Sequence, residues 1–236
     1  MAIARLASLN EHFKPRKVKV EIEDKVAVVT LSPPTKVTVL GQAILHELCL
    51  TLELLEKDDA VSVVVLTGGQ GATFGAGADI TGIAKMDSKY MLFDDLWESD
   101  WYRVLPTFRK PLIAAINGVA FGGGLEVAMM ADILLCTEKA QLGLPEVNLG
   151  LITGGGGVTR LRQAVGKSKA SEMLLTGEPI LGTEALKLGL VSRVYSDKDS
   201  LLAGALAMAK KIASKSQMAA GYTKRAIRQS LEAGET

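Results

Sequence analysis

Histidine, cysteine and aromatic residues are scarce in this chain of 236 residues. Two histidines, His12 and His46, exclude a histidine-rich zinc site and leave at most two candidates for a histidine-dependent triad. The two cysteines, Cys49 and Cys136, cannot build a disulfide scaffold, and their apolar surroundings indicate a reducing compartment. No apolar run approaches the roughly 20 residues that span a bilayer. We therefore expect an intracellular protein of the cytoplasm or the mitochondrial matrix, with no membrane partner.

An excess of charge of either sign is also missing. Lysine and arginine number 27 and aspartate and glutamate 26, which gives a formal net charge of +1. Nothing in this balance predicts nucleic acid, an acidic membrane or a polyanion as the main partner. The length suits one large domain, or one domain with an appendage.

Alternating strand and helix patterns predict an α/β fold. The residues Val18–Glu23 have the period of a half-solvated strand, and Val26–Leu31 resembles a more buried one. Further strands are expected at 61–66, 112–116 and 133–136, and helices at 44–55, 90–105, 122–130, after 154–157, at 201–213 and at 218–231. Because only helices are expected beyond about residue 195, we divide the chain into a core, 1–195, and a C-terminal helical segment, 196–236.

Glycine is abundant and gathers at 68–77, 122–124 and 154–157, but the common nucleotide motifs do not fit. A dinucleotide fingerprint starting at Gly69 would need glycine or alanine at position 74, which is Phe74. A phosphate loop ending in Gly166-Lys167-Ser168 would need glycine at position 161, which is leucine, so we expect a helix-capping turn there. No serine-hydrolase elbow is present.

Two glutamates inside apolar segments are the strongest candidates for chemistry. Glu126 lies one turn into a helix that begins at the glycines 122–124, and Glu146 lies in Leu-Gly-Leu-Pro-Glu-Val. A carboxylate in such surroundings is expensive to bury as an anion. One such glutamate could be explained without chemistry, as an exposed helix residue or as a carboxylate that interacts with the positive end of the helix dipole. Two, each beside a glycine segment that lets the main chain approach a reacting group, favour a general acid/base pair.

Long, ordered motifs then resemble a known family. These are Phe74-Gly-Ala-Gly-Ala-Asp79-Ile, the segment from Lys110 to Glu126, Ala131-Asp132-Ile and Pro145-Glu146. Together they are similar to the crotonase (enoyl-CoA hydratase/isomerase) superfamily over roughly residues 18–230. The resemblance implies a crotonase-like spiral core of ββα units and a C-terminal helical trimerisation segment, here shorter than is typical. It also implies a homotrimer or a dimer of trimers.

For the site, the resemblance to the hydratase branch implies that Glu126 and Glu146 are catalytic. The oxyanion hole falls on the N–H groups of Ala78 and Gly123, where the start of a helix adds its dipole. The acyl-CoA side is expected to be lined by Ala76, Asp79, Ile80 and Thr81. The implied reaction adds water to a 2-trans-enoyl-CoA, as in fatty-acid β-oxidation, and needs neither a metal nor a cofactor beyond the coenzyme A of the substrate.

Three other functions stay open. A Δ3,Δ2-enoyl-CoA isomerase needs a single carboxylate, so the presence of two favours hydration. An RNA-binding relative would use a lysine-rich helix, whereas 46–59 carries Glu47, Glu53 and Glu56 against Lys57. A degenerate subunit with weak coenzyme binding is the third, because positions 72 and 81, where the family often has lysine, are alanine and threonine.

Overall fold

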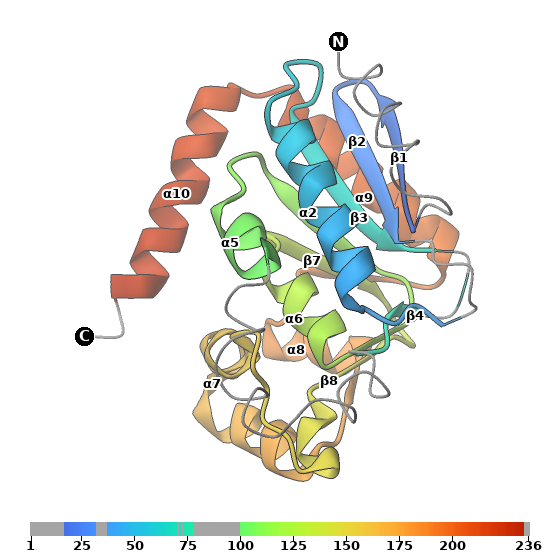
Figure 1. Cartoon of the computed structure of the whole chain (residues 1–236), viewed down its shortest axis with the longest axis vertical. Coiled ribbons are helices and arrows are strands. Elements are labelled where there is room, and N and C mark those ends of the chain that lie inside the picture. The colour runs from blue at the N-terminus through green and yellow to red at the C-terminus, as the bar shows by residue number, and fades with distance from the viewer. Residues whose placement is uncertain (1–16, 32–36, 70, 72, 78–99, 234–236) are drawn as a thin grey trace.

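The computed structural model describes residues 17–31, 37–69, 71, 73–77 and 100–233 (Figure 1). A six-stranded sheet in the order β1-β2-β3-β5-β7-β10 lies at its centre, antiparallel between β1 and β2 and parallel elsewhere. Its strands are β1 (Val18–Glu23), β2 (Val26–Leu31), β3 (Val63–Gly68), β5 (Leu112–Ile116), β7 (Ile133–Thr137) and β10 (Arg193–Tyr195). This is the α/β fold that the sequence predicts.

A second, four-stranded sheet in the order β4-β6-β8-β9 builds the repeating unit. Its strands are β4 (Thr73–Gly75), β6 (Val119–Phe121), β8 (Gln141–Gly143) and β9 (Ile180–Leu181). Each of β3, β5 and β7 in the large sheet is followed by a strand of the small sheet and then by a helix. The helices are α5 (Asp100–Thr107), α6 (Gly123–Met129) and the short 3₁₀ helix η1 (Pro145–Leu149) with α7 (Gly157–Thr176). The spiral of ββα units is therefore confirmed.

The two faces of the large sheet carry different layers. Along β3, Val64 and Leu66 belong to the main core under α2 (Gln42–Glu56), while Val63 and Val65 belong to a smaller core under α9 (Lys198–Ala213). This alternation follows the period of two of a strand whose faces are both covered. Helix α9 buries Leu201, Ala205 and Ala209 at a spacing of four residues, so its apolar face is covered within the chain itself.

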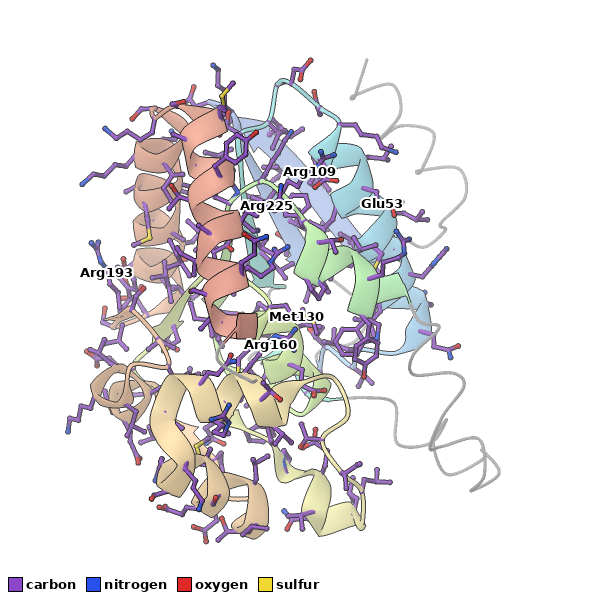
Figure 2. The ribbon with its side chains drawn as sticks, turned by 90° about the vertical axis from the view of Figure 1, so that its left-hand side faces the viewer. Glu53, Arg109, Met130, Arg160, Arg193 and Arg225 are labelled. Carbon is purple, nitrogen blue, oxygen red and sulfur yellow. The ribbon has the colours of Figure 1, made fainter. Side chains whose placement is uncertain are left out.

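The last helix, α10 (Gln217–Ala233), is held largely by polar contacts on the outside of the molecule (Figures 1 and 2). Lys224 is buried and forms an ion pair of 2.7 Å with Asp132, just after α6. Arg228 donates to the carbonyl of Phe108 at 3.3 Å. The large apolar side chains of α10 are exposed: Met218, Tyr222, Ile227 and Leu231.

Most of the expected elements are present, with local differences. The strand expected at 61–66 runs from Val63 to Gly68, because Val61 is still in the turn after α2, where its N–H donates to Asp58 O at 3.0 Å. Helix α5 is described only from Asp100, and the rest of the helix expected at 90–105 lies outside the described residues. Gly166 interrupts α7 with a φ of 78°. Helix α8 (Gly182–Leu188) was not expected.

Candidate active site

Glu126 is a buried carboxylate on a helix that starts at a glycine-rich turn. Gly122 precedes α6 with a φ of 51°, a region that L side chains rarely adopt, and the chain enters the helix there from β6. Three residues into α6, the side chain of Glu126 is only 4% exposed. Its Oε1 accepts a hydrogen bond of 3.0 Å from the backbone N–H of Gly157. The carboxylate therefore faces the inside of the molecule and is bound there.

The glycines at the start of α7 pack directly onto this carboxylate. A Cβ at Gly155 would overlap Oε2 of Glu126 and the ring of Trp101. A Cβ at Gly157 would lie 3.0 Å from Oε1 and 2.6 Å from Cγ2 of Thr153. The loop can follow the contour of Glu126 only because these positions have no side chain.

Glu146 comes from a different element and packs against Gly122, the glycine that precedes α6. It lies in η1, after Pro145, and is partly buried. Its Oε1 lies 3.0 Å from where a Cβ on Gly122 would stand. Burial raises the pKa of Glu146, against hydrogen bonds that include one from the side chain of Thr153. Its Oε2 is buried without a hydrogen-bond partner in the part of the chain that the structure describes, which leaves one oxygen for a ligand or water.

The two carboxylates are electrostatically coupled. The pKa of Glu126 is raised to about 7, chiefly by burial and also by the charge of Glu146, while hydrogen bonds from the N–H groups of Gly157 and Gly155 and the charge of Arg160 lower it. Coupled carboxyls of this kind titrate as a pair. Glu126, with a pKa of about 7, can take up or release a proton near neutral pH, and the raised pKa of Glu146 favours its protonated form relative to an exposed carboxyl.

The backbone of the first glycine segment, at 75–77, packs against the glycines at the start of α6. Gly75 and Gly124 touch, because a Cβ at Gly124 would overlap the carbonyl of Gly75. Gly77 has a φ of 95°, and its Cα lies 3.7 Å from where a Cβ on Gly122 would stand. The N–H of Ala76 donates to the carbonyl of Thr38 at 2.8 Å.

The oxyanion hole itself is described only in part. Gly123 is the first residue of α6, so its N–H has no partner within the helix and can face a ligand. The other expected donor, Ala78, lies outside the described residues, as do Asp79, Ile80 and Thr81. Their roles stay predictions, as does the pairing of the two N–H groups.

Several residues around the carboxylates are not marked by the sequence alone. Thr153 contacts the Gly157 position and donates to Glu146. Tyr102 packs against Trp101 with ring centroids 4.1 Å apart and a tilt of 36° between the rings. Burial raises the pKa of Tyr102, and the nearby charge of Glu126 raises it as well. Arg160 also interacts with Glu126. In the sequence, the glycines 154–157 indicate that the backbone closely approaches another group, but they do not identify that group.

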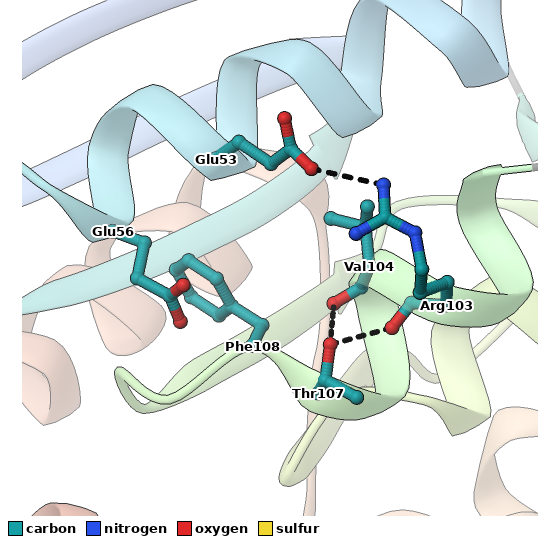
Figure 3. Close-up of a pocket in the computed structure, with 6 residues that line it drawn as sticks. All are labelled: Glu53, Glu56, Arg103, Val104, Thr107 and Phe108. Atoms are coloured by element: carbon teal, nitrogen blue, oxygen red, sulfur yellow. Dashed lines mark hydrogen bonds and ion pairs between the residues drawn. The ribbon is translucent and has the colours of Figure 1, made fainter.

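No group of three histidine, cysteine, aspartate or glutamate side chains in the described ranges could hold a metal ion. A separate small pocket, with space of about 60 Å³, lies between α2 and α5 (Figure 3). Its lining is largely polar and includes an ion pair of 3.2 Å between Arg103 and Glu53. Neither Glu126 nor Glu146 lines it.

Comparison with known proteins agrees with this geometry. The family model described as "Enoyl-CoA hydratase/isomerase" matches residues 21–236. A probable mitochondrial enoyl-CoA hydratase of Dictyostelium discoideum is 42% identical over 212 residues, covering 90% of this chain and 75% of that protein. A 2,3-dehydroadipyl-CoA hydratase of Escherichia coli is 42% identical over 210 residues, covering 89% and 81%.

A solved structure of similar shape is a subunit of an enoyl-CoA hydratase from Geobacillus kaustophilus. It is 32% identical, has a TM-score of 0.85 and covers 92% of this chain and 83% of its own. An enoyl-CoA hydratase from Bacillus anthracis is also 32% identical, with a TM-score of 0.82 over 90% and 82%. The spiral fold, the matched family model and relatives of this similarity lead to one conclusion. The chain belongs to the enoyl-CoA hydratase/isomerase family.

Proposed function

We propose that this protein is an enoyl-CoA hydratase, which adds water to a 2-trans-enoyl-CoA and gives a 3-hydroxyacyl-CoA. The observation that carries the proposal is the pair of carboxylates, buried Glu126 and partly buried Glu146, which come from two different elements and both pack against glycine backbone. Hydration needs both a proton acceptor and a proton donor, and the pair supplies both. The relatives named as hydratases at 42% identity support it.

In the proposed mechanism the two carboxylates hold one water against the β-carbon of the substrate. Glu126 takes a proton from the water as its oxygen bonds to the β-carbon, and Glu146 delivers a proton to the α-carbon. One C–O bond and one C–H bond form while the carbon–carbon double bond is lost. The pKa of Glu126, about 7, suits the role of base, because a carboxyl that titrates near the working pH can take up a proton and release it again. Burial raises the pKa of Glu146, which favours the protonated form that a proton donor needs.

The negative charge that develops on the thioester oxygen needs two N–H donors in water-poor surroundings. We assign these to Gly123 and Ala78. Each donor of this kind contributes roughly 3–4 kcal/mol to transition-state stabilisation. The thioester is the coenzyme A ester of the substrate, so the proposed reaction requires no further cofactor.

A Δ3,Δ2-isomerase is the second candidate, because the matched family model includes isomerases. An isomerase moves one proton and needs one carboxylate. The space beside Glu126 holds a second carboxylate with a free, buried oxygen among the described residues, which favours a bound water. A subunit without coenzyme A binding would lack activity altogether, so one assay separates it from both enzymes.

The surface of α2 is less acidic than its sequence predicts. Glu47 does not belong to an acidic face of α2, because it is 1% exposed and accepts the backbone N–H groups of Lys17 and Val18. Only Glu53 and Glu56 face the surface pocket of Figure 3, where Glu53 pairs with an arginine. Two glutamates still make this helix a poor site for phosphate, and we propose no nucleic-acid partner.

The direct test is the loss of absorbance of the enoyl-thioester band with crotonyl-CoA and with longer 2-enoyl-CoAs. We expect turnover with the thioesters and none with free crotonate, because only the thioester places an oxygen at the two N–H groups. Turnover of crotonate at a comparable rate would contradict the oxyanion assignment. No loss of absorbance with any 2-enoyl-CoA would contradict the proposed function.

We also propose a homotrimer or a dimer of trimers in the cytoplasm or the mitochondrial matrix. Four large apolar side chains on α10 are 48–75% exposed in the single chain, which is typical of a surface that another subunit covers. Light scattering should report about 75 or 150 kDa, three or six times the chain mass of 25.0 kDa. A monomer would contradict this assembly. No helix within the described ranges has the length and apolar character that crossing a membrane requires.

A further inference from the structure

We propose that Arg160 is a positioning residue for Glu126, which fixes the loop 155–157 against this carboxylate and supplies a permanent positive charge behind it. The inference rests on the proposed function of Glu126 as the base. Arg160 binds the backbone of this loop, and the loop in turn donates a hydrogen bond to the carboxylate of Glu126.

The first observation is where Arg160 lies in its helix. It is the fourth residue of α7, in the first turn, where the helix dipole disfavours a cation. The side chain is also partly buried, and this burial lowers its pKa, although attraction to Glu126 raises it. A charged group placed against both effects needs a compensating partner, and the nearby carboxylate is that partner.

The second observation is its contact with the loop. Nη1 of Arg160 donates to the carbonyl of Gly155 at 3.1 Å. The guanidinium lies over Gly156, whose φ is 79° and where a Cβ would overlap Nη1. The bend of the backbone and the place of the guanidinium therefore depend on each other.

The same three-residue loop holds Glu126 from its other side. The N–H of Gly157 donates to Oε1 at 3.0 Å, and Gly155 packs against Oε2. A shift of the loop at Gly155 would move the donor at Gly157 with it, since only one residue separates them. Arg160 thus controls the orientation of the carboxylate through the backbone.

Three other charged or titratable groups act within the cluster. Glu146 on η1 acts on Glu126, and Tyr102 on α5 interacts with both Glu126 and Arg160. Arg228 on α10 is close enough to lower the pKa of Arg160. Figure 2 shows Arg160 beneath the C-terminal end of α10. Among these groups Arg160 is the cation that favours the ionised form of Glu126.

The test compares Arg160→Met, which keeps the volume and removes the charge, with Arg160→Lys, which keeps the charge. The control is Arg193→Met, an exposed arginine on β10 that points away from this cluster (Figure 2). Hydration of crotonyl-CoA is followed between about pH 5 and pH 9. We expect Arg160→Met to lower kcat by about 10–100-fold, with KM within about threefold, because a misplaced base slows the chemical step.

The pH profile separates positioning from a loss of folding. Removing the cation raises the pKa of Glu126, so the acid limb of kcat/KM should move to higher pH in Arg160→Met. Arg160→Lys should return the limb to the parent position and recover part of kcat, and Arg193→Met should match the parent. An unmoved limb in Arg160→Met, or the same loss in Arg193→Met, would overturn the proposal.

A direct titration keeps this test independent of the proposed function. With ¹³C-labelled glutamate, the resonance of Glu126 is identified by its absence in Glu126→Gln and followed against pH. The titration midpoint of Glu126 should move upward in Arg160→Met whether or not the parent hydrates an enoyl-CoA. A parent without hydratase activity would overturn only the proposed function. If Arg160→Met does not fold, Arg160→Gln takes its place with the same expected direction. A midpoint equal to that of the parent overturns the role of Arg160.

Discussion

The carboxylate of Glu126 and the N–H of Gly157 are joined by a hydrogen bond of 3.0 Å across 31 residues of sequence. The bond connects the helix after β6 to the start of α7, two successive units of the spiral. A side chain at position 157 has no room, because its Cβ would lie 2.6 Å from Thr153 and 3.0 Å from Glu126. The orientation of the proposed base therefore depends on a glycine.

Gly157→Ala should displace Glu126 or the loop and impair hydration more than folding. We expect kcat for crotonyl-CoA to fall by roughly 100-fold, the effect of moving a catalytic group by about 1 Å. The steady-state assay gives kcat, and circular dichroism checks that the variant is folded. A folded variant with parental kcat would show that this contact does not set the position of the base.

The matched control is Gly221→Ala on α10. A Cβ there would meet only the carbonyl of Arg109, at an ordinary 3.9 Å. Because alanine favours a helix interior over glycine, this variant should be as active as the parent and more stable by about 0.5–1 kcal/mol. A thermal melt and the same assay measure both.

Sequence patterns predict the regular elements of this fold well where they are long or buried on both sides. The strands 18–23, 26–31 and 112–116 and the helix α2 follow from period and composition alone. Strands β4, β6, β8 and β9 are only two or three residues long, too short to show a period. These short strands form because the ββα spiral places them side by side in one sheet, so their pairing depends on contacts between distant segments.

The site is predicted unevenly for a similar reason. Glu126 and Glu146 are conspicuous because a carboxylate inside an apolar segment is unusual. Thr153 and Arg160 lie on either side of the glycines 154–157, and nothing in the sequence distinguishes them; only the return of the chain before α7 brings them to the carboxylates. A contact between distant segments leaves no local signal.

The variants Glu126→Gln and Glu146→Gln separate a hydratase from an isomerase. If both carboxylates move protons in hydration, each variant should lower kcat for 2-enoyl-CoA by roughly 10²–10⁴, the usual range for a positioned acid or base. Ligand affinity should change little, since glutamine keeps the volume. The measurement is turnover of both variants on 2-enoyl-CoA in water and on 3-enoyl-CoA.

The 3-enoyl-CoA substrate is the control in this comparison. An isomerase transfers one proton with one carboxylate, so one of the two variants would turn over 3-enoyl-CoA at nearly the parental rate. If Glu146→Gln leaves hydration within about threefold of the parent, the two-carboxylate mechanism is wrong.

Burial of Glu126 also predicts how stability varies with pH. The pKa of this group rises from 4.5 in the unfolded chain to about 7 in the folded protein. Its stabilising contribution is therefore complete below pH 4.5 and is lost as the pH rises through 7. Glu126→Gln removes this loss, so the variant should gain a few kcal/mol (about 2–3) over the parent at pH 8.

Thermal melts of parent and variant at several pH values check this expectation. The difference in melting temperature should be largest at pH about 8 and shrink as the pH falls towards 5, as linkage requires. Glu138→Gln, at an exposed position on the turn after β7, is the control and should show no such trend. A difference for Glu126→Gln that does not vary with pH would mean that the buried carboxyl is not the cause.

The ion pair between Lys224 and Asp132 anchors α10, and its loss should destabilise the protein. Nζ of Lys224 lies 2.7 Å from the carboxylate and also donates to the carbonyl of Lys110 at 2.8 Å. Burial lowers the pKa of Lys224 although Asp132 raises it, so the pair bears a desolvation cost that only the intact contacts offset. Lys224→Met leaves Asp132 with the N–H of Leu112 as its remaining partner among the described residues and should cost about 2–4 kcal/mol.

A cost of this size lowers the melting temperature by roughly 5–10 °C for a chain of this length. The double variant Lys224→Met/Asp132→Asn should recover part of the loss, because no uncompensated charge remains beside the methionine. Lys211→Met, an exposed lysine on α9, should stay within about 0.5 kcal/mol of the parent. If Lys224→Met melts with the parent, α10 is held by its other contacts, Arg228 with Phe108 above all, and the ion pair contributes no net stability.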